Sequence, residues 1–209
     1  MIILKNTGHK IKNRSIQVKI YMIFSFILIG ITSCTYEKSE NFVVFEKLIV
    51  QIDPFISIKD TLKISPNGKR VAYMAKSSDR WFVVVDGKEE KQYDGILQDS
   101  LIFSPDSKHV AYASQLSNKL IAVVDGKEGK QYDNLSSIIF SPDSKRVAYQ
   151  AKSGDKQFVV VDGKEEKQYD VIVGGKIIFD TPVRLYYLAL KGNSIYMVEK
   201  IWKKRLKLL

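Results

Sequence analysis

With 209 residues, of which 45% are hydrophobic and 27% charged, the chain has the length and balance of one globular domain with its own core, which excludes an intrinsically disordered protein. Part of its formal net charge of +10 lies at the amino terminus, where five Lys or Arg and no acid precede Cys34. In the body of the chain Lys and Glu are interleaved, as in Lys88-Glu89-Glu90-Lys91. Such a mixed surface excludes the concentrated positive stripe that nucleic-acid binding requires, so we expect no nucleic-acid partner.

The first segment, residues 1–33, has the pattern of a targeting signal. A basic stretch ends at Lys19, and an apolar run follows over residues 20–31, interrupted only by Ser25 and Gly30. A helix that crosses a membrane needs about 20 apolar residues, whereas a shorter run is typical of a signal-peptide core. We therefore predict a signal or anchor helix that exports the rest of the chain.

The residues Ile31-Thr32-Ser33-Cys34 follow this run directly. They resemble the lipoprotein signal of bacteria, in which a peptidase cuts before the cysteine and the cysteine thiol receives diacylglycerol. The resemblance implies that Cys34 is the first mature residue and the site of lipidation. The alternative is an uncleaved signal anchor in which the cysteine is incidental. In both cases we expect the protein in the cell envelope, anchored to the membrane and facing outward, on the periplasmic or cell-surface side.

After an expected linker over residues 34–41, three copies of one unit give the strongest signal in the sequence. Each copy contains Ser-Pro, Val-Ala-Tyr, Val-Val-Asp-Gly-Lys-Glu and Lys-Gln-Tyr-Asp in this order. Weaker copies flank the three, a partial one before them and a degenerate one after them. The units and the basic tail are assigned to residues 42–64 (partial), 65–103, 104–140, 141–176, 177–200 (degenerate) and 201–209 (tail).

Each unit is expected to form four short strands. An apolar strand ends at the Ser-Pro turn, and the second strand follows, as in Arg70 to Met74. The third strand, Phe82 to Val85, is apolar throughout, which is typical of a strand covered on both faces. Asp86-Gly87 then predicts a two-residue hairpin, and the charged strand Lys88 to Tyr93 suits an exposed edge. This is the pattern of one propeller blade.

The segments Phe103-Ser104-Pro105-Asp106 and Phe140-Ser141-Pro142-Asp143 resemble a motif of exported WD-like propeller repeats, the TolB-type family. In two copies Ser107 and Ser144 stand where that family usually has glycine. The resemblance covers about residues 42–200. It implies an all-β fold, a β-propeller-like array of about four to five four-stranded blades whose terminal ones are partial. The array closes into a ring if the two end pieces complete one another, and otherwise forms an open arc.

The sequence offers no recognisable catalytic or metal-binding group. The body of the chain has one histidine, His109, which stands where the sister units have Arg70 and Arg146, so we interpret it as a surface side chain. One cysteine and one histidine are too few for a zinc site, and the repeated aspartates fall on separate blades. We expect no enzyme, no metal and no cofactor.

One set of residues is a candidate binding face, because a Tyr-Asp pair ends the fourth strand of each unit. A ring would bring these pairs to one mouth as a polar, aromatic-rimmed surface. The structural interpretation, which we favour because the residues recur in every repeat, is that tyrosine pairs across strands and aspartate begins the next turn. The residues are Tyr93, Asp94, Tyr132, Asp133, Tyr169 and Asp170.

The leading functional hypothesis is a membrane-anchored exported lipoprotein with a propeller body that acts as a protein- or ligand-binding scaffold. Its expected partners are the membrane, through the lipid or signal anchor, and another envelope protein. The alternative is a truncated or split propeller domain of an exported enzyme such as a peptidase.

Overall fold

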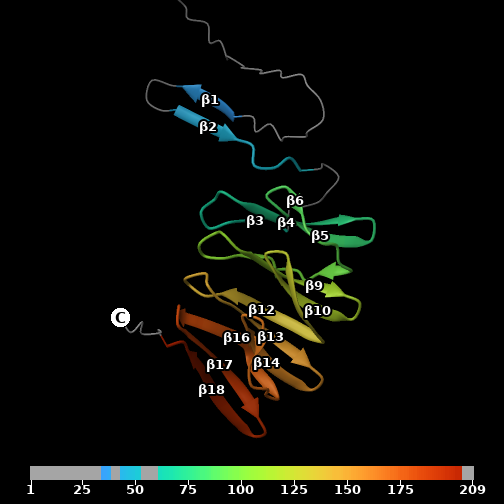
Figure 1. Ribbon diagram of the computed structural model, residues 1–209, viewed down its shortest axis with the longest axis vertical. Coiled ribbons are helices and arrows are strands. Elements are labelled where there is room, and N and C mark those ends of the chain that lie inside the picture. Colours follow the sequence, from blue (N-terminus) through green and yellow to red (C-terminus); the bar gives the residue numbers. More distant parts are fainter. Residues whose placement is uncertain (1–33, 39–42, 53–60, 204–209) are drawn as a thin grey trace, which may run out of the picture. The chain divides into compact units, whose positions relative to one another are not determined.

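The computed structural model describes residues 34–38, 43–52 and 61–203, and all the regular elements within these ranges are β-strands (Figure 1). The expectation of an all-β fold is confirmed. The signal or anchor helix expected over residues 1–33 lies outside the described residues, as do residues 39–42, 53–60 and 204–209.

The described chain begins with a two-stranded antiparallel sheet of β1 (Cys34–Lys38) and β2 (Val43–Lys47), in which Cys34 lies opposite Lys47. Residues 34–38 of the segment expected as a linker over residues 34–41 thus lie in a strand, and the division of the chain into a linker and repeats stays a prediction. The Thr-Tyr pair of this strand is typical of strands, since branched and aromatic side chains suit a pleated surface.

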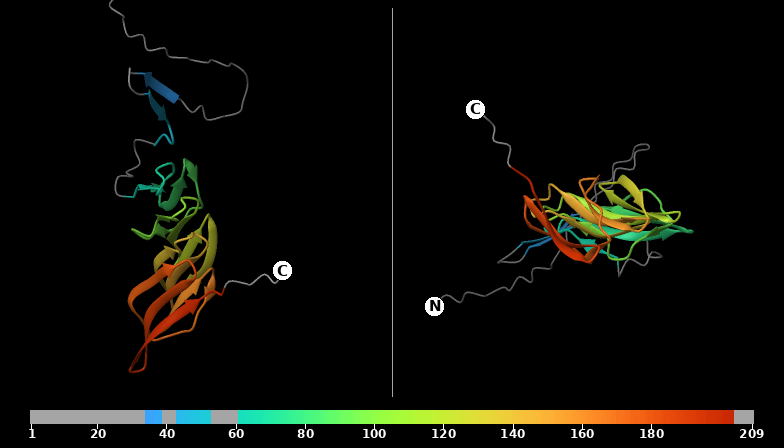
Figure 2. Two further views of the ribbon diagram at one scale, coloured as in Figure 1. Left: turned by 90° about the vertical axis from the view of Figure 1, so that its left-hand side faces the viewer. Right: turned by 90° about the horizontal axis from the view of Figure 1, so that it is seen from below.

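Four larger antiparallel sheets follow in chain order and are called blades 1 to 4 (Figures 1 and 2). Blade 1 contains β3 (Lys63–Ile64), β4 (Val71–Ser77), β5 (Arg80–Val85) and β6 (Lys88–Glu89). Blade 2 contains β7 (Gly95–Ile96), β8 (Ile102–Phe103), β9 (Val110–Leu116), β10 (Lys119–Val124) and β11 (Lys127–Tyr132). Blade 3 contains β12 (Asn134–Phe140), β13 (Val147–Ser153), β14 (Lys156–Val161) and β15 (Lys164–Glu165). Blade 4 contains β16 (Val171–Thr181), β17 (Arg184–Lys191) and β18 (Ser194–Ile201).

Within each blade the strands pair mainly with their neighbours in sequence. The strand before each Ser-Pro turn pairs with the strand after it, as β8 does with β9, so the blades begin earlier than the units assigned from residue 65. In blade 2, β7 and β8 are two pieces that share the partner β9. Blade 4 differs, because within the part of the chain that the structure describes its third strand, β18, pairs with β17 alone, whereas the third strands of blades 1 to 3 also pair with a fourth strand.

The Asp-Gly pairs form the hairpin turns that the sequence predicts. Asp86, Asp125 and Asp162 have φ angles of 52°, 50° and 51°, and each following glycine also has a positive φ. Two consecutive residues with positive φ are what a type I′ turn requires, and Asp-Gly adopts them at little cost. The same type of hairpin turn therefore connects the third and fourth strands of blades 1 to 3.

The core lies between the blades, because successive residues of a strand point to opposite faces of the sheet. The front face of each blade, which carries the second-strand tyrosine, packs on the back face of the preceding blade, which carries the neighbouring alanine. Tyr112 of blade 2 lies in one cluster with Ala72 of blade 1, and Tyr149 of blade 3 lies with Ala111 of blade 2. Each fully buried Val or Phe of these faces contributes about 1.5–3 kcal/mol.

Candidate functional site

The tyrosines of the predicted binding face lie between the blades rather than on a rim. Tyr93, Tyr132 and Tyr169 are all buried. The ring of each meets edge-on the second-strand tyrosine of the next blade, with centroids 6.2, 6.2 and 6.3 Å apart. Burial raises the pKa of Tyr93 to about 12 and that of Tyr132 further above its usual value. These side chains are neutral members of the core.

The aspartates that follow them connect one blade to the next. One carboxylate oxygen of Asp94, Asp133 and Asp170 accepts a hydrogen bond from a backbone N–H in the second hairpin of the following blade. The donors are the N–H groups of Ser117 at 2.6 Å, Gly154 at 2.7 Å and Gly192 at 2.7 Å. The other oxygen pairs with a cation of the same blade, Arg80, Lys119 or Lys156.

The electrostatics of these aspartates fit a structural role. The side chain of Lys119 is the main cause that lowers the pKa of Asp133, and Lys156 does the same for Asp170. The structural interpretation therefore accounts for the contacts of the whole Tyr-Asp set. A ligand on the exposed part of the aspartates stays a prediction.

A second network surrounds the Asp-Gly turns. Asp125 Oδ1 accepts the backbone N–H of Val110 at 3.0 Å, while Oδ2 lies 2.7 Å from Nδ1 of His109. The His109 ring also stacks on Phe140 of blade 3, with centroids 6.3 Å apart. In the sister blades Arg70 lies over Phe103 of blade 2 and Arg146 over Trp202, which follows β18 of blade 4. His109 thus contacts the next blade, although the sequence suggested only a surface side chain.

Ser107 and Ser144 form hydrogen bonds between blades that the sequence did not predict. Both are buried and have φ angles of 66° and 61°, the region that glycine usually occupies. Ser107 Oγ accepts the backbone N–H of Asn67 at 3.1 Å, and Ser144 Oγ accepts that of Asp106 at 2.9 Å. Their signal was present in the sequence, because a serine that replaces the usual glycine needs a compensating contact.

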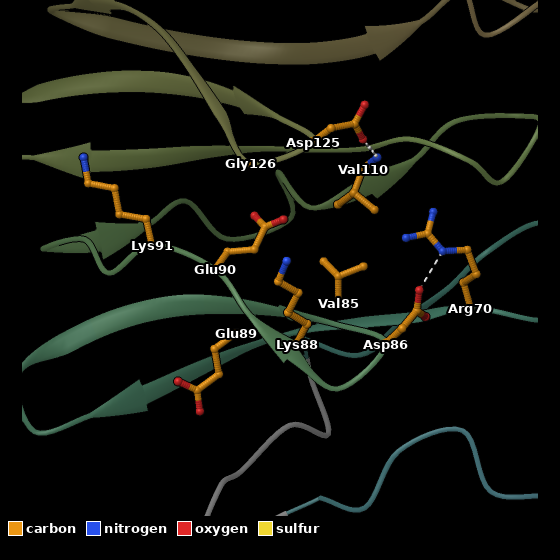
Figure 3. A pocket seen from close by; sticks show the side chains of 10 residues that line it. All are labelled: Arg70, Val85, Asp86, Lys88, Glu89, Glu90, Lys91, Val110, Asp125 and Gly126. Carbon is orange, nitrogen blue, oxygen red and sulfur yellow. Dashed lines mark hydrogen bonds and ion pairs between the residues drawn. The ribbon is translucent and has the colours of Figure 1, made fainter. Parts of the chain in front are cut away.

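A hollow with a volume of about 570 Å³ lies between the Asp-Gly turns of blades 1 and 2 (Figure 3). Val85 and Val110 give it apolar patches, and Arg70 pairs there with Asp86 at 2.7 Å. The other lining residues are charged or lie in the second turn: Lys88, Glu89, Glu90, Lys91, Asp125 and Gly126. Among the residues that the structure describes, those that line it include no Ser, Cys or His, so it offers no nucleophile paired with a histidine base.

Three hydroxyl groups, those of Tyr93, Tyr112 and Ser114, are buried in the core between blades 1 and 2. Tyr112 donates its hydroxyl to Glu90 at 2.7 Å, whereas the Tyr93 hydroxyl and Ser114 Oγ have no hydrogen-bond partner among the described residues. Ser114 stands where blades 1 and 3 have Ala75 and Ala151.

The described ranges contain neither a cluster of metal-binding side chains nor a membrane-spanning helix. Over residues 34–38, 43–52 and 61–203, no three His, Cys, Asp or Glu side chains lie close enough together to hold a metal ion. Nor does this part of the chain form a helix of the length and hydropathy that crossing a membrane demands.

The back face of blade 4 exposes apolar side chains. Ile195, Met197 and Ile201 are 66%, 65% and 61% exposed, and Leu188 lies opposite Met197 in the sheet register. The positions that match Met197 in blades 1 to 3 are Val83, Ala122 and Val159, all of them buried under the next blade. A closed ring would cover this face with blade 1, so the described residues match the alternative in which a terminal face stays exposed.

No protein-family model matches the chain, and no curated protein matches it in sequence. Among solved structures, it is similar to the β-propeller domain of the trilobed protease from Pyrococcus furiosus, with 14% identity and a TM-score of 0.45 over 72% of this chain and 55% of that one. It is similar to TolB from Acinetobacter baumannii, with 14% identity and a TM-score of 0.39 over 68% of this chain and 42% of that one. It is also similar to an acylaminoacyl peptidase, with 16% identity and a TM-score of 0.40 over 72% and 33%.

The chain spans between one third and somewhat more than half of the length of these solved chains. The pairing of its strands and the apolar clusters between its sheets show the blade architecture of the chain.

Proposed function

We propose that this chain is an exported scaffold, anchored to the membrane of the cell envelope, that binds protein through the back face of blade 4. The observation that supports the binding role is the run of exposed Leu, Ile and Met side chains on that face. Soluble proteins rarely expose a contiguous apolar patch, and such a patch marks an interaction surface.

The anchor is proposed from the amino-terminal pattern. A basic stretch, a short apolar run and Ser33-Cys34 together have the order of a lipoprotein signal. Acyl chains on Cys34 would hold the body firmly, because each buried methylene contributes about 0.8 kcal/mol and more than one chain is attached. The body would then face outward, where an envelope protein can reach blade 4.

A non-catalytic role is part of the same proposal. His109 contacts Asp125 and stacks on Phe140, so its ring already has partners. The hollow between blades 1 and 2 is lined largely by side chains of opposite charge. Binding by a rigid stack of blades needs neither a nucleophile nor a cofactor.

Photo-cross-linking of the full-length chain in its own membrane tests the binding role. A photoreactive amino acid replaces Met197, and a matched control places it at Ile64, which is 63% exposed in blade 1. We expect protein adducts from position 197 and few from position 64. Equal yields at the two positions, or no protein adduct at position 197, would refute binding through this face.

A further inference from the structure

The outer strand of blade 4 has one edge without a partner strand. β18 pairs over its whole length, Ser194–Ile201, with β17 on one side. The matching third strands of blades 1 to 3, which are β5, β10 and β14, pair with a fourth strand on the other side as well. Within the ranges that the structure describes, no strand takes that place beside β18. This side of β18 is called the free edge.

Blade 3 shows which residues of β18 lie along the free edge. In each blade the second-strand tyrosine lies opposite one residue of the third strand, and this pair gives blades 3 and 4 a common register. In this register Ile195 matches Gln157. Two residues further along the strand, Met197 matches Val159. What these two residues of blade 3 bind therefore indicates what β18 can bind.

In blade 3 both residues bond to the segment that forms the fourth strand. Gln157 exchanges two backbone hydrogen bonds with Tyr169, at 2.9 and 3.0 Å. The carbonyl group of Val159 accepts the backbone N–H of Glu166 at 2.9 Å. Since alternate residues of a strand direct their N–H and C=O groups to the same side, the matching residues of β18 direct theirs to the free edge. Both of them are exposed, so a further strand can reach these groups.

A lysine beside the free edge indicates the charge of a strand that would fit there. Lys91 of blade 1 pairs with Glu128 in the fourth strand of blade 2, at 2.8 Å. Lys130 of blade 2 pairs in the same way with Glu165 in the fourth strand of blade 3, at 3.1 Å. Lys167 is the matching residue of blade 3, and among the described side chains no carboxylate pairs with it. A fourth strand of blade 4 is therefore expected to supply an acid.

The register also shows which side of an added strand carries the acid. Glu165 lies opposite Val160, and Val160 matches Val198 of β18. Val198 packs against the cluster between blades 3 and 4, and a residue opposite it points to the same face, toward Lys167. The residues before and after point to the back face, beside the exposed side chain of Met197. A fitting strand is acidic on one side and apolar on the other.

We propose that an extended acidic segment of another protein adds to β18 as the fourth strand of blade 4. Its residue opposite Val198 is acidic and pairs with Lys167, and its neighbours are apolar and contact Met197. Backbone hydrogen bonds supply the affinity of such an added strand, and alternate side chains supply its specificity. The inference rests on the proposed function and deepens it, because it names the chemistry of the partner and the edge that it binds.

Fluorescence anisotropy with the purified full-length chain tests the proposal. The probe is a short labelled peptide in which valine and glutamate alternate, and the control is a peptide in which valine and lysine alternate. We expect the acidic peptide to bind. The basic peptide should bind at least about tenfold more weakly, because like charges then meet at Lys167.

A charge reversal shows whether the peptide binds beside Lys167. Lys167→Glu should weaken binding of the acidic peptide about tenfold, since attraction becomes repulsion. Lys69→Glu is the matched control, because it makes the same change of charge at an exposed position of blade 1 and should leave the affinity unchanged. Neither substitution alters the backbone.

A proline shows whether the peptide binds through the backbone of the free edge. Met197→Pro removes an N–H group that faces the free edge and none that bonds to β17, so binding should weaken about tenfold or more. Met197→Ala keeps this N–H group and should bind within about threefold of the parent chain. A thermal melt identifies a variant that does not fold, and Lys167→Glu then decides the test.

The possible results separate this inference from the proposed function. Binding of the acidic peptide that Lys167→Glu and Met197→Pro weaken, and that the control variants keep, supports the added strand. Equal binding of the two peptides, binding that Lys167→Glu or a folded Met197→Pro leaves unchanged, or no binding at all overturns it. A photo-adduct at position 197 would in that case still support the scaffold function. The absence of both peptide binding and a protein photo-adduct overturns both.

Discussion

The Ser-Pro-Asp turn of blade 2 is held by one carboxylate. Asp106 Oδ1 accepts the Ser104 hydroxyl at 2.6 Å and the backbone N–H of Lys108 at 3.1 Å. These hydrogen bonds, the Ser104 one first, lower the pKa of Asp106 to about 2. Blade 1 builds the same turn with Asn67, which accepts from Ser65 and from the Lys69 N–H. The turn therefore exists in a charged and an uncharged form within one chain.

This pair of turns predicts how stability depends on pH. A carboxylate whose pKa is lower in the folded state contributes stability above its unfolded pKa of about 4, and that contribution is lost as the pH falls through about 2. The variant Asp106→Asn should be less stable than the parent at pH 7, and the difference should disappear near pH 2. Urea unfolding over a pH series measures it.

The reciprocal change is the matched control. Asn67→Asp should add a stabilisation of the same sign and pH range to blade 1. A stability difference between Asp106→Asn and the parent that stays constant from pH 7 to pH 2 would contradict the assignment of the charge to this turn.

At the scale of elements, neighbouring blades are joined by a residue that lies before the second strand of each. In blade 1 Arg70 pairs with Asp86, lies over Phe103 and donates to the carbonyl groups of Ser107 and Lys108. In blade 2 His109 pairs with Asp125 and stacks on Phe140, but its ring is too short to donate to the matching carbonyls.

The variant His109→Arg should therefore stabilise the contact of blades 2 and 3, by up to about 1 kcal/mol, because arginine adds donors and a longer planar group. Arg70→His should destabilise blades 1 and 2 by a similar amount. Chemical denaturation of the two variants measures both signs. A loss of stability in His109→Arg would show that blade 2 is adapted to the smaller ring.

The sequence predicts those parts of the blades whose backbone conformation depends on a few neighbouring residues. The Asp-Gly turns and the third strands agree with the structure because turn conformation and apolar runs act over a few residues. The expected fourth strand Lys88 to Tyr93 is shorter, since only Lys88 and Glu89 join β6 while Tyr93 bridges to Trp81. The burial of Tyr93 and the hydrogen bond that Ser107 accepts depend on the neighbouring blade. The sequence of a single repeat therefore does not predict them.

For the whole molecule, the position of Cys34 decides where the body is held. The variant Cys34→Ser removes the thiol that the lipoprotein pattern assigns to diacylglycerol, so we expect the full-length chain to lose all labelling by radioactive fatty acid. It should also be retained in the membrane as an unprocessed precursor of higher mass. Gel electrophoresis of labelled cells measures both quantities.

The control for this change is Ser33→Ala, which keeps a small residue before the cysteine and should preserve labelling. Undiminished labelling of Cys34→Ser would refute lipidation at this residue, and an unlabelled parent chain of full mass would favour the uncleaved anchor.

The aspartates that reach from one blade into the next give the molecule a graded response to damage. Asp94, Asp133 and Asp170 each hold a loop of the adjacent blade only, and the apolar clusters likewise join adjacent pairs. A defect in one blade is then felt chiefly by the sheets on its two sides, as in a one-dimensional chain of coupled units. Among the described residues, blades 1 and 4 each have a neighbouring blade on one side only, but the outer face of blade 1 is buried while that of blade 4 is exposed, so thermal fraying should start at blade 4 and travel toward blade 1.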